Sequence, residues 1–233
     1  MKKKIFVGWD SREDIAYQVC ARSILRQSRA SVDIVPLKQD ELAARGLYLR
    51  DKDPLASTEF TYTRFLTPTL AEYRGWALFM DCDFLVTADI AEVFDLADER
   101  YAVMCVKHDH RPKEALKMDG VAQTVYPRKN WSSFVLWNCG HPANRTLTSE
   151  VVNRETGAYL HRFSWLADEL IGALPETWNW LEGWCKKPEQ GTPKGIHYTR
   201  GGPWFSNTQE VDYADLWLAE AKHLPAFTPL LKT

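Results

Sequence analysis

Basic residues are not in excess in this sequence, and that balance excludes one large class of function. Lysine and arginine together number 29 and aspartate and glutamate number 31, which gives a formal net charge of -2 over 233 residues. Proteins that hold DNA or RNA neutralise many phosphates and carry a clear positive excess. We therefore expect no nucleic-acid partner. A phosphate-bearing ligand is expected to be a small molecule, held by a metal ion or by a few placed cations.

Cysteine pairs with the spacing of a metal or redox site are also lacking. The five cysteines are odd in number and no two have C-x-x-C spacing, so neither a zinc knuckle nor a disulfide framework is indicated. Three of them, Cys82, Cys105 and Cys139, lie in or beside apolar runs, where cysteine behaves as a small hydrophobic residue. This usage is typical of a protein in a reducing compartment.

Long apolar runs are absent as well. No stretch approaches the roughly 20 apolar residues that a membrane-spanning helix needs. The N-terminal run from Ile5 to Val7 is too short for the core of a signal peptide. The sequence therefore predicts a soluble, cytoplasmic protein, and it leaves open a peripheral contact with the inner face of a membrane.

The order of the expected elements indicates an α/β fold. The patterns predict strands over residues 4–7 and 32–37 with an amphipathic helix between them, a βαβ unit that implies a parallel sheet and a right-handed crossover. Further strands are predicted over 76–80, 101–106 and 131–137, and further helices over 58–73, 148–156, 165–174 and 212–223. We expect one domain over residues 1–233, with a mostly parallel central sheet flanked by helices.

Two carboxylates, Asp81 and Asp83, follow the continuous apolar run from Trp76 to Met80, which is typical of a central strand buried on both faces. Burying ionised carboxylates without compensation costs several kcal/mol. A divalent cation would offset that cost, and hard oxygen ligands suit Mg²⁺ or Mn²⁺. The C-terminal edge of the strand is also where open α/β sheets bind ligands. The alternative is that the two aspartates only cap the following turn.

A second group of candidate residues lies between Gly195 and Trp204. His197 offers a neutral imidazole, which is a good ligand for manganese. Arg200 is a cation that can bind a diphosphate through two hydrogen bonds, and Gly201 and Gly202 would let backbone N–H groups approach phosphate oxygens closely. The segment therefore predicts a third metal ligand beside a diphosphate site. For the histidine alone, the alternative is a hydrogen-bonded loop residue.

Together the two motifs resemble the glycosyltransferases of the GT-A fold, in particular glycosyltransferase family 8, the galactosyltransferase and glycogenin group. The likeness extends through most of the chain. It implies a single GT-A-like (Rossmann-like) domain, a nucleotide-sugar donor with UDP as the expected nucleotide, and transfer with retention of the anomeric configuration. It also implies a Mn²⁺ or Mg²⁺ cofactor held by Asp81, Asp83 and His197, and a C-terminal region, residues 176–233, that closes the donor site.

Other segments are similar to the donor-binding motifs of that family. The segment around Gly8 and Asp10 is similar to the opening strand and the loop that contact the nucleotide. Arg64 is similar to an arginine that contacts the nucleotide-sugar. Asn138 lies in a Trp-Asn-Cys-Gly segment that is similar to an Asn-x-Gly segment near the donor sugar. The resemblance implies donor contacts for all four residues.

The sequence departs from the family at two places. The late motif is one residue shorter and has no lysine for the diphosphate, so Arg200 is expected to replace it. The family's Asp-Gln pair, which faces the reaction centre, corresponds to Asp168 and Glu169. A carboxylate near the anomeric carbon stabilises or attacks an oxocarbenium-like state, so Glu169 is the candidate group beneath that carbon and Asp168 a contact of sugar hydroxyls. The alternative is a pair of acids on a solvated helix end.

His108 and His110 have the spacing of a possible metal pair. They follow a predicted strand, in which residues i and i+2 share a face. No further histidine or cysteine lies close in the sequence to complete a site. We therefore expect the segment to line the acceptor pocket or to be solvated, and not to bind a metal.

Two other classes of protein share parts of this pattern. A phosphohydrolase of the haloacid-dehalogenase type also places Asp-x-Asp after a hydrophobic strand and binds magnesium, but its motif continues into a threonine where this chain has Leu85. A non-catalytic carbohydrate-binding protein is suggested by the 10 tryptophans, although tryptophan also fills cores and interfaces. For the glycosyltransferase, the expected acceptor is a carbohydrate or a lipid-linked glycan.

Overall fold

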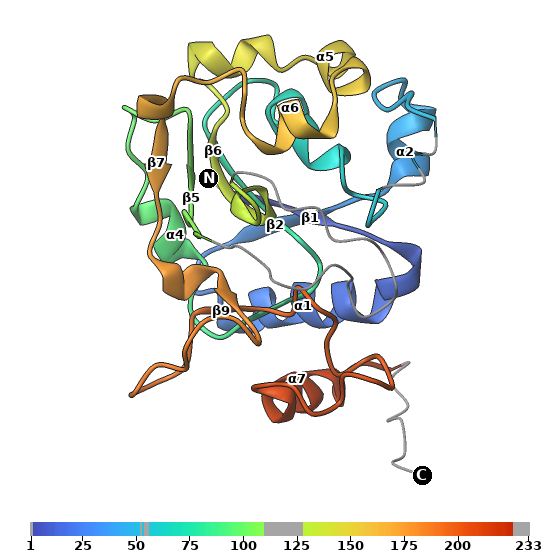
Figure 1. The fold of residues 1–233 in the computed structure, drawn as a ribbon, viewed down its shortest axis with the longest axis vertical. Helices are drawn as coiled ribbons and strands as arrows, with labels where there is room; N and C mark the ends of the chain where they lie inside the picture. The colour runs from blue at the N-terminus through green and yellow to red at the C-terminus, as the bar shows by residue number, and fades with distance from the viewer. Residues whose placement is uncertain (1, 52, 54–55, 110–127, 226–233) are drawn as a thin grey trace.

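The computed structural model describes residues 2–51, 53, 56–109 and 128–225 (Figure 1). The chain begins with the predicted βαβ unit. Strand β1 (Lys3–Gly8) leads through the 3-10 turn η1 (Ser11–Glu13) into helix α1 (Asp14–Gln27), and β2 (Val32–Leu37) returns parallel to β1. Helix α1 forms because its apolar side chains recur at helical spacing, and that face is the one it buries.

A six-stranded sheet in the order β2-β1-β3-β6-β5-β7 forms the centre of the molecule. Its other strands are β3 (Trp76–Met80), β5 (Val103–Cys105), β6 (Phe134–Asn138) and β7 (Ile171–Ala173). Strand β6 runs antiparallel to its neighbours β3 and β5, whereas the pairs β1–β2, β1–β3 and β5–β7 are parallel. The predicted α/β class with a mostly parallel central sheet is confirmed.

A smaller sheet joins the C-terminal part of the chain to the end of β3. It consists of β4 (Phe84–Val86), β8 (Trp180–Leu181) and β9 (Gly195–His197), in the order β4-β9-β8. Strand β9 is antiparallel to β4 and parallel to β8. The residues that follow β3 therefore lie beside a segment from the last quarter of the chain.

Helices cover both faces of the central sheet (Figure 1). Helices α5 (Ser149–Arg154) and α6 (Gly157–His161) lie on one face and α1 on the other, with α7 (Ala214–Ala221) packed outside α1. The remaining helices are α2 (Gln39–Ala44), α3 (Thr67–Leu70) and α4 (Ala91–Asp95), and the remaining 3-10 turns are η2 (Thr63–Leu66), η3 (Trp131–Ser133), η4 (Pro142–Thr146), η5 (Asp168–Leu170) and η6 (Glu176–Trp178). Within the described part of the chain, no helix is both long and apolar enough to span a membrane.

Two predicted elements differ from the structure. The helix expected over 165–174 is wrong: this segment forms η5 and then strand β7, because Ile171 to Ala173 pair with β5 at the edge of the sheet. In the segment 58–73, Pro68 was expected to interrupt a helix. It stands instead in the first turn of α3, where a residue without an N–H costs nothing.

Candidate functional site

Asp81 and Asp83 lie in the short connection between β3 and β4, at the C-terminal edge of the central sheet. The N–H of Asp81 donates to the carbonyl of Ser133 at 2.9 Å, which holds the chain against the start of β6 as it leaves β3. Between the two aspartates, Cys82 is 1% exposed, and burial holds the pKa of its thiol well above the usual range. Cys82 is therefore a buried, unreactive thiol, as predicted, and the two carboxylates are the polar groups of this turn.

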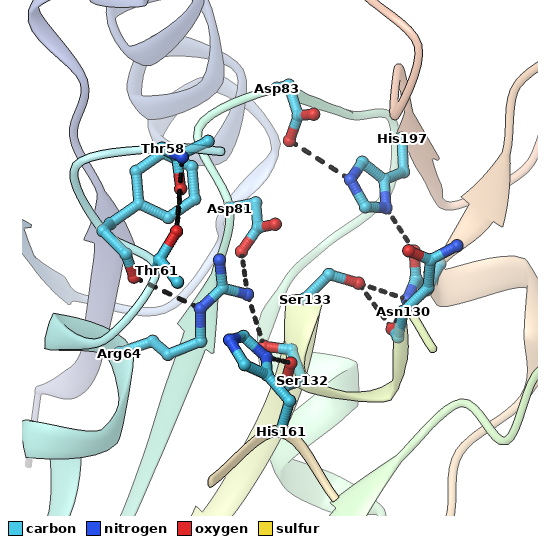
Figure 2. A network of polar contacts seen from close by, with 12 residues as sticks. Thr58, Thr61, Arg64, Asp81, Asp83, Asn130, Ser132, Ser133, His161 and His197 are labelled. Carbon is cyan, nitrogen blue, oxygen red and sulfur yellow. Dashed lines mark hydrogen bonds and ion pairs between the residues drawn. The ribbon is translucent and has the colours of Figure 1, made fainter. Parts of the chain in front are cut away.

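The pairing of β4 with β9 brings His197 to these carboxylates. Phe84 lies opposite His197 in the antiparallel register, and the N–H of Tyr198 donates to the carbonyl of Asp83 at 3.0 Å. The rings of Phe84 and His197 stack with centroids 4.2 Å apart. This arrangement leaves Nε2 of His197 3.2 Å from Oδ1 of Asp83 (Figure 2). Potential ligand atoms of Asp81, Asp83 and His197 all lie within 4.8 Å of one another, so the structure brings the three predicted metal ligands together.

A buried amide determines which nitrogen of His197 carries its proton. Nδ2 of Asn179 donates to the carbonyl of Asn130 at 3.3 Å and to Oγ of Ser133 at 3.0 Å. The other amide atom, Oδ1, lies 2.8 Å from Nδ1 of His197 and can only accept. Nδ1 of His197 is therefore protonated, and in the neutral ring Nε2 presents its lone pair toward Asp83. This is the orientation that a metal-binding histidine requires.

Arg64 lies beside the cluster, at Asp81. Its side chain is buried, and one guanidinium nitrogen lies 2.8 Å from Oδ1 of Asp81 (Figure 2). The same guanidinium donates to the carbonyls of Ser132 and Phe60, at 2.9 and 3.2 Å. The nearby Oγ of Ser132 is 2.7 Å from Nδ1 of His161, at the end of α6. Arg64 therefore balances the charge of Asp81 and fixes the direction of its carboxylate.

A pocket of about 230 Å³ opens beside Asp83. Its walls come from both ends of the chain: the loop after β1 contributes Arg12, and the segment after β9 contributes Arg200 and Gly201. The other lining residues are Glu13, Ser57, Thr58, Tyr198, Thr199, Phe205 and Asn207. The lining thus combines two arginines with the acidic residues Asp83 and Glu13. The arginines suit an anionic ligand that also approaches the Asp81–Asp83–His197 cluster.

Asp10 holds Arg12, one of the residues that line this pocket, in place. Its side chain is 0% exposed, and it accepts hydrogen bonds from the N–H of Arg12 at 2.9 Å, from the Arg12 guanidinium, and from the N–H of Glu59 at 3.1 Å. Burial alone would raise the pKa of Asp10, but the bonds from Arg12 and Glu59 outweigh it and lower the pKa below its usual value. Asp10 was expected to contact the nucleotide. In the structure its carboxylate is hydrogen-bonded to Arg12, and Arg12 is one of the residues that line the pocket.

The glycines expected at the donor have different roles in the structure. A β-carbon on Gly8 would lie 2.5 Å from the ring of Phe60, and one on Gly202 would lie 2.0 Å from the ring of Trp204. Both glycines therefore make room for aromatic rings. The N–H of Gly201 donates to the carbonyl of Tyr198 at 2.9 Å and so closes a turn instead of pointing to a ligand. Gly201 still lines the pocket, while Gly202 is not among the described residues that do.

The structure does not bring Asn138 to the cluster. Asn138 pairs with Trp76 at the N-terminal end of β3, whereas Asp81 follows the other end of that strand. Five residue steps lead from Trp76 to Asp81, roughly 17 Å at the usual rise per residue. The side-chain amide of Asn138 donates to Glu99 at 3.0 Å. Asn138 therefore lies at the edge of the sheet opposite to Asp81 and is bonded to Glu99 there.

Asp168 and Glu169 lie on η5 and are exposed, with 84% of the Asp168 side chain accessible. Asp168 forms an ion pair with Arg128. Neither residue belongs to the group of ligand atoms around Asp81. Their predicted place beneath the donor sugar stays a prediction.

Sequence reasoning missed several residues that build the site. Arg12 and Asn179 are the most important of them, because Arg12 lines the pocket and Asn179 orients His197. Arg12 follows Asp10 by two residues, and this acid–base spacing in a loop is a signal that could have been read. The contact between Asn179 and its partner Ser133 could not have been predicted, since only the fold brings η3 and the end of η6 together.

Relatives were sought among known proteins. The sequence matches no known protein-family model. It is 58% identical to Protein CDI of Arabidopsis thaliana over 220 residues, which cover 93% of this chain and 85% of that protein. The chain belongs to the Protein CDI family. The name of this family states no activity, so the activity of the CDI-family chain has to be argued from its fold and its site.

Solved structures establish the fold of the CDI-family chain. It is similar to the bifunctional glycosyltransferase WbbM, with a TM-score of 0.68 and 17% identity over 96% of this chain and 50% of that chain. It is similar as well to the galactosyltransferase LgtC, solved with donor and acceptor sugar analogues, with a TM-score of 0.64 and 13% identity over 97% of both chains. The CDI-family chain thus spans half of WbbM and nearly all of LgtC. The predicted GT-A fold, similar to that of family 8 glycosyltransferases, is confirmed.

Proposed function

We propose that this chain is a metal-dependent glycosyltransferase. It moves a sugar, a hexose being expected, from a nucleotide-diphosphate donor to a carbohydrate or lipid-linked glycan, with retention of the anomeric configuration and with UDP as the expected nucleotide. The observation that carries the proposal is the convergence of Asp81, Asp83 and His197 at the ligand-binding edge of a GT-A fold. The similarity to LgtC, which binds donor and acceptor sugar analogues, supports the choice of substrates.

The residues present fit a Mn²⁺ or Mg²⁺ ion. Asp81 and Asp83 supply hard oxygen donors and His197 one nitrogen, and their atoms are within 4.8 Å of one another. Because Nδ1 of His197 keeps the ring proton, Nε2 and Oδ1 of Asp83 face each other as two acceptors only 3.2 Å apart. Two acceptors at that distance need a cation between them, either a metal ion or a second proton on the ring. When bound, the metal supplies Lewis-acid stabilisation of the departing diphosphate.

The surrounding residues prepare the site for a diphosphate. Arg12 and Arg200 both line the pocket and offset phosphate charge. Arg64 holds the carboxylate of Asp81, and Asn179 holds the ring of His197, so neither ligand has to reorient when the donor binds. The C-terminal region, from 176 onward, closes the donor site in this proposal, with its residues 198–207 forming one wall; residues 226–233 lie outside the described part of the chain. A cytoplasmic location, reaching the inner face of a membrane when the acceptor is lipid-linked, belongs to the same proposal.

The proposal is tested by calorimetry with UDP in the presence and absence of Mn²⁺. We expect binding that requires the metal, and we expect Asp83→Asn to abolish it. Asp33→Asn is the matched control, because Asp33 is an exposed aspartate on β2 and its replacement removes the same charge elsewhere. A screen of nucleotide-sugars with Mn²⁺ then identifies the donor by the rise in melting temperature that any ligand of the native state produces.

Three results would contradict the proposal. UDP binding that is equally strong without metal excludes the cluster as the metal site. Binding of oligosaccharides alone, without UDP binding, indicates a carbohydrate-binding protein. Release of phosphate from a generic phosphate ester indicates a phosphohydrolase of the haloacid-dehalogenase type.

A further inference from the structure

A second group of potential metal ligands lies outside the Asp81–Asp83–His197 cluster. A ring nitrogen of His108, a carboxylate oxygen of Glu176 and Sγ of Cys185 all lie within 4.8 Å of one another. They come from three separate segments: His108 follows β5, Glu176 begins η6, and Cys185 follows β8. Only the tertiary fold brings them together, whereas the expectation that His108 binds no metal rested on the lack of a further ligand close in the sequence.

The backbone of the group is fixed by hydrogen bonds. The N–H of His108 donates to the carbonyl of Val106 at 3.1 Å, and its carbonyl accepts from Nε1 of Trp131 at 2.9 Å. The N–H of Cys185 donates to the carbonyl of Leu181 at 2.9 Å. Two of the three ligands therefore project from anchored turns, so the group is positioned before any ion arrives.

The sulfur of Cys185 has the hydrogen bonds that a metal thiolate needs. It accepts a bond from the N–H of Leu181 at 3.4 Å, and such a bond stabilises negative charge on sulfur. It donates its own proton to Glu176 at 3.2 Å. That proton lies between the sulfur and the carboxylate, in the place that a cation held by both would occupy. Binding of a divalent ion here forms a metal–sulfur bond and releases the thiol proton to solvent.

We propose that His108, Glu176 and Cys185 form a zinc site. One nitrogen, one oxygen and one sulfur make a donor set that suits borderline-soft Zn²⁺, whereas Mg²⁺ and Mn²⁺ favour oxygen ligands. Three protein ligands leave the fourth tetrahedral position for water. The chain thus separates two kinds of metal by ligand hardness, with oxygen-rich donors at Asp81 and Asp83 and a thiolate at Cys185.

The proposed zinc ion has a structural role. The carbonyl of Glu176 accepts from the N–H of Asn179 at 3.0 Å, so the 3-10 turn η6 connects the zinc ligand directly to the residue that orients His197. An ion that ties Glu176 to His108 and Cys185 joins this turn to the ends of β5 and β8. This inference does not depend on the glycosyltransferase proposal, since it concerns different ligands and a different metal.

Cobalt is the probe that tests the site. Co²⁺ bound to a thiolate gives a charge-transfer band in the near ultraviolet, and Zn²⁺ displaces it. In chelator-treated protein we expect one equivalent of Co²⁺ with this band, its loss on adding Zn²⁺, and a rise in melting temperature with Zn²⁺. Asp83→Asn is the matched control, because it removes a ligand of the other cluster and should leave the band in place.

Two variants remove ligands of the proposed site. Cys185→Ser replaces sulfur by oxygen in a half-buried side chain and should abolish both the band and the stabilisation by zinc. His108→Gln should abolish the stabilisation. The proposal is overturned if the unmodified protein shows no thiolate band with excess Co²⁺, or if the band survives in Cys185→Ser.

Discussion

Oδ1 of Asn179 lies 2.8 Å from Nδ1 of His197 and accepts a hydrogen bond from it. Asn179 follows η6 and His197 ends β9, and both side chains are buried. Because this bond fixes the tautomer, it decides that Nε2 of His197 faces the two aspartates with a lone pair. Asn179 therefore orients His197, and in the proposed function it acts on the metal through that residue without being a ligand.

Replacing Asn179 by alanine should weaken metal binding. We expect the affinity for Mn²⁺ to fall about 10- to 100-fold, which is the usual cost of losing a residue that orients a metal ligand. Titration calorimetry with Mn²⁺ measures it. Asn153→Ala is the control, because the Asn153 side chain also donates amide hydrogen bonds but lies on α5, and its loss should change stability without changing affinity. An unchanged Mn²⁺ affinity in Asn179→Ala would show that the tautomer is set by another group.

Asp10 should make the stability of the protein depend on pH in the acid range. The pKa of Asp10 in the folded protein lies below its ordinary value of 3.8, so the native state favours the ionised form. The resulting stabilisation is fully present above pH 3.8 and is lost as the pH falls through the lower, folded-state pKa. We expect Asp10→Asn to lower the free energy of unfolding by about 1–3 kcal/mol at neutral pH. Urea unfolding at a series of pH values should show this difference shrinking below pH 3.8; a difference independent of pH would refute the assignment.

Gly8 should not tolerate a side chain while Phe60 is present. A β-carbon at this position would lie 2.5 Å from two atoms of the Phe60 ring, so Gly8→Ala should cost about 1–3 kcal/mol through overpacking. In a Phe60→Ala background the same change should cost much less, and a double-mutant cycle from urea unfolding measures the coupling. Gly140→Ala is the control, since the nearest atom to its β-carbon is 3.6 Å away. Equal costs of Gly8→Ala in both backgrounds would contradict the contact.

Glu169→Gln tests the predicted role of that carboxylate. If Glu169 stabilises or attacks the anomeric carbon, turnover should fall about 100-fold or more while donor affinity stays nearly intact. The glutamate side chain is exposed, so the variant should fold normally. Glu150→Gln, which changes an exposed glutamate on α5, serves as the control in the same UDP-release assay. Unchanged turnover in Glu169→Gln removes this residue from the mechanism.

The parts of the fold that were predictable are those with a local signal. Trp76 to Met80 form β3 over the predicted residues, because an unbroken apolar run bounded by Asp81 has few alternatives to a buried strand. The first βαβ unit was likewise predictable from periodicity. The grouping of Asp81, Asp83 and His197 was predictable because each stands in a recognisable motif, although the register that joins β4 to β9 was not foreseen. Their role as metal ligands stays a prediction.

The features that the sequence did not predict depend on contacts between distant segments. Residues 171–173 form an edge strand because β5 offers them a partner, and no property of the segment itself excludes a helix. Asn138 follows an apolar strand as Asp81 does, but β6 is antiparallel to β3, so the end of β6 lies at the opposite edge of the sheet. The sequence alone does not show whether a strand runs parallel or antiparallel to its neighbour. The grouping of His108, Glu176 and Cys185 was not predictable either, because only the fold brings these three segments together.

The pairing of β4 with β9 has a consequence for synthesis of the protein. Strand β4 leaves the ribosome long before β9, its partner. Asp81 and Asp83 are therefore synthesised well before His197 can lie beside them. A nascent or prematurely terminated chain that stops ahead of Gly195 lacks both the imidazole and the strand that carries it. The group of Asp81, Asp83 and His197 can therefore form only after synthesis has passed His197.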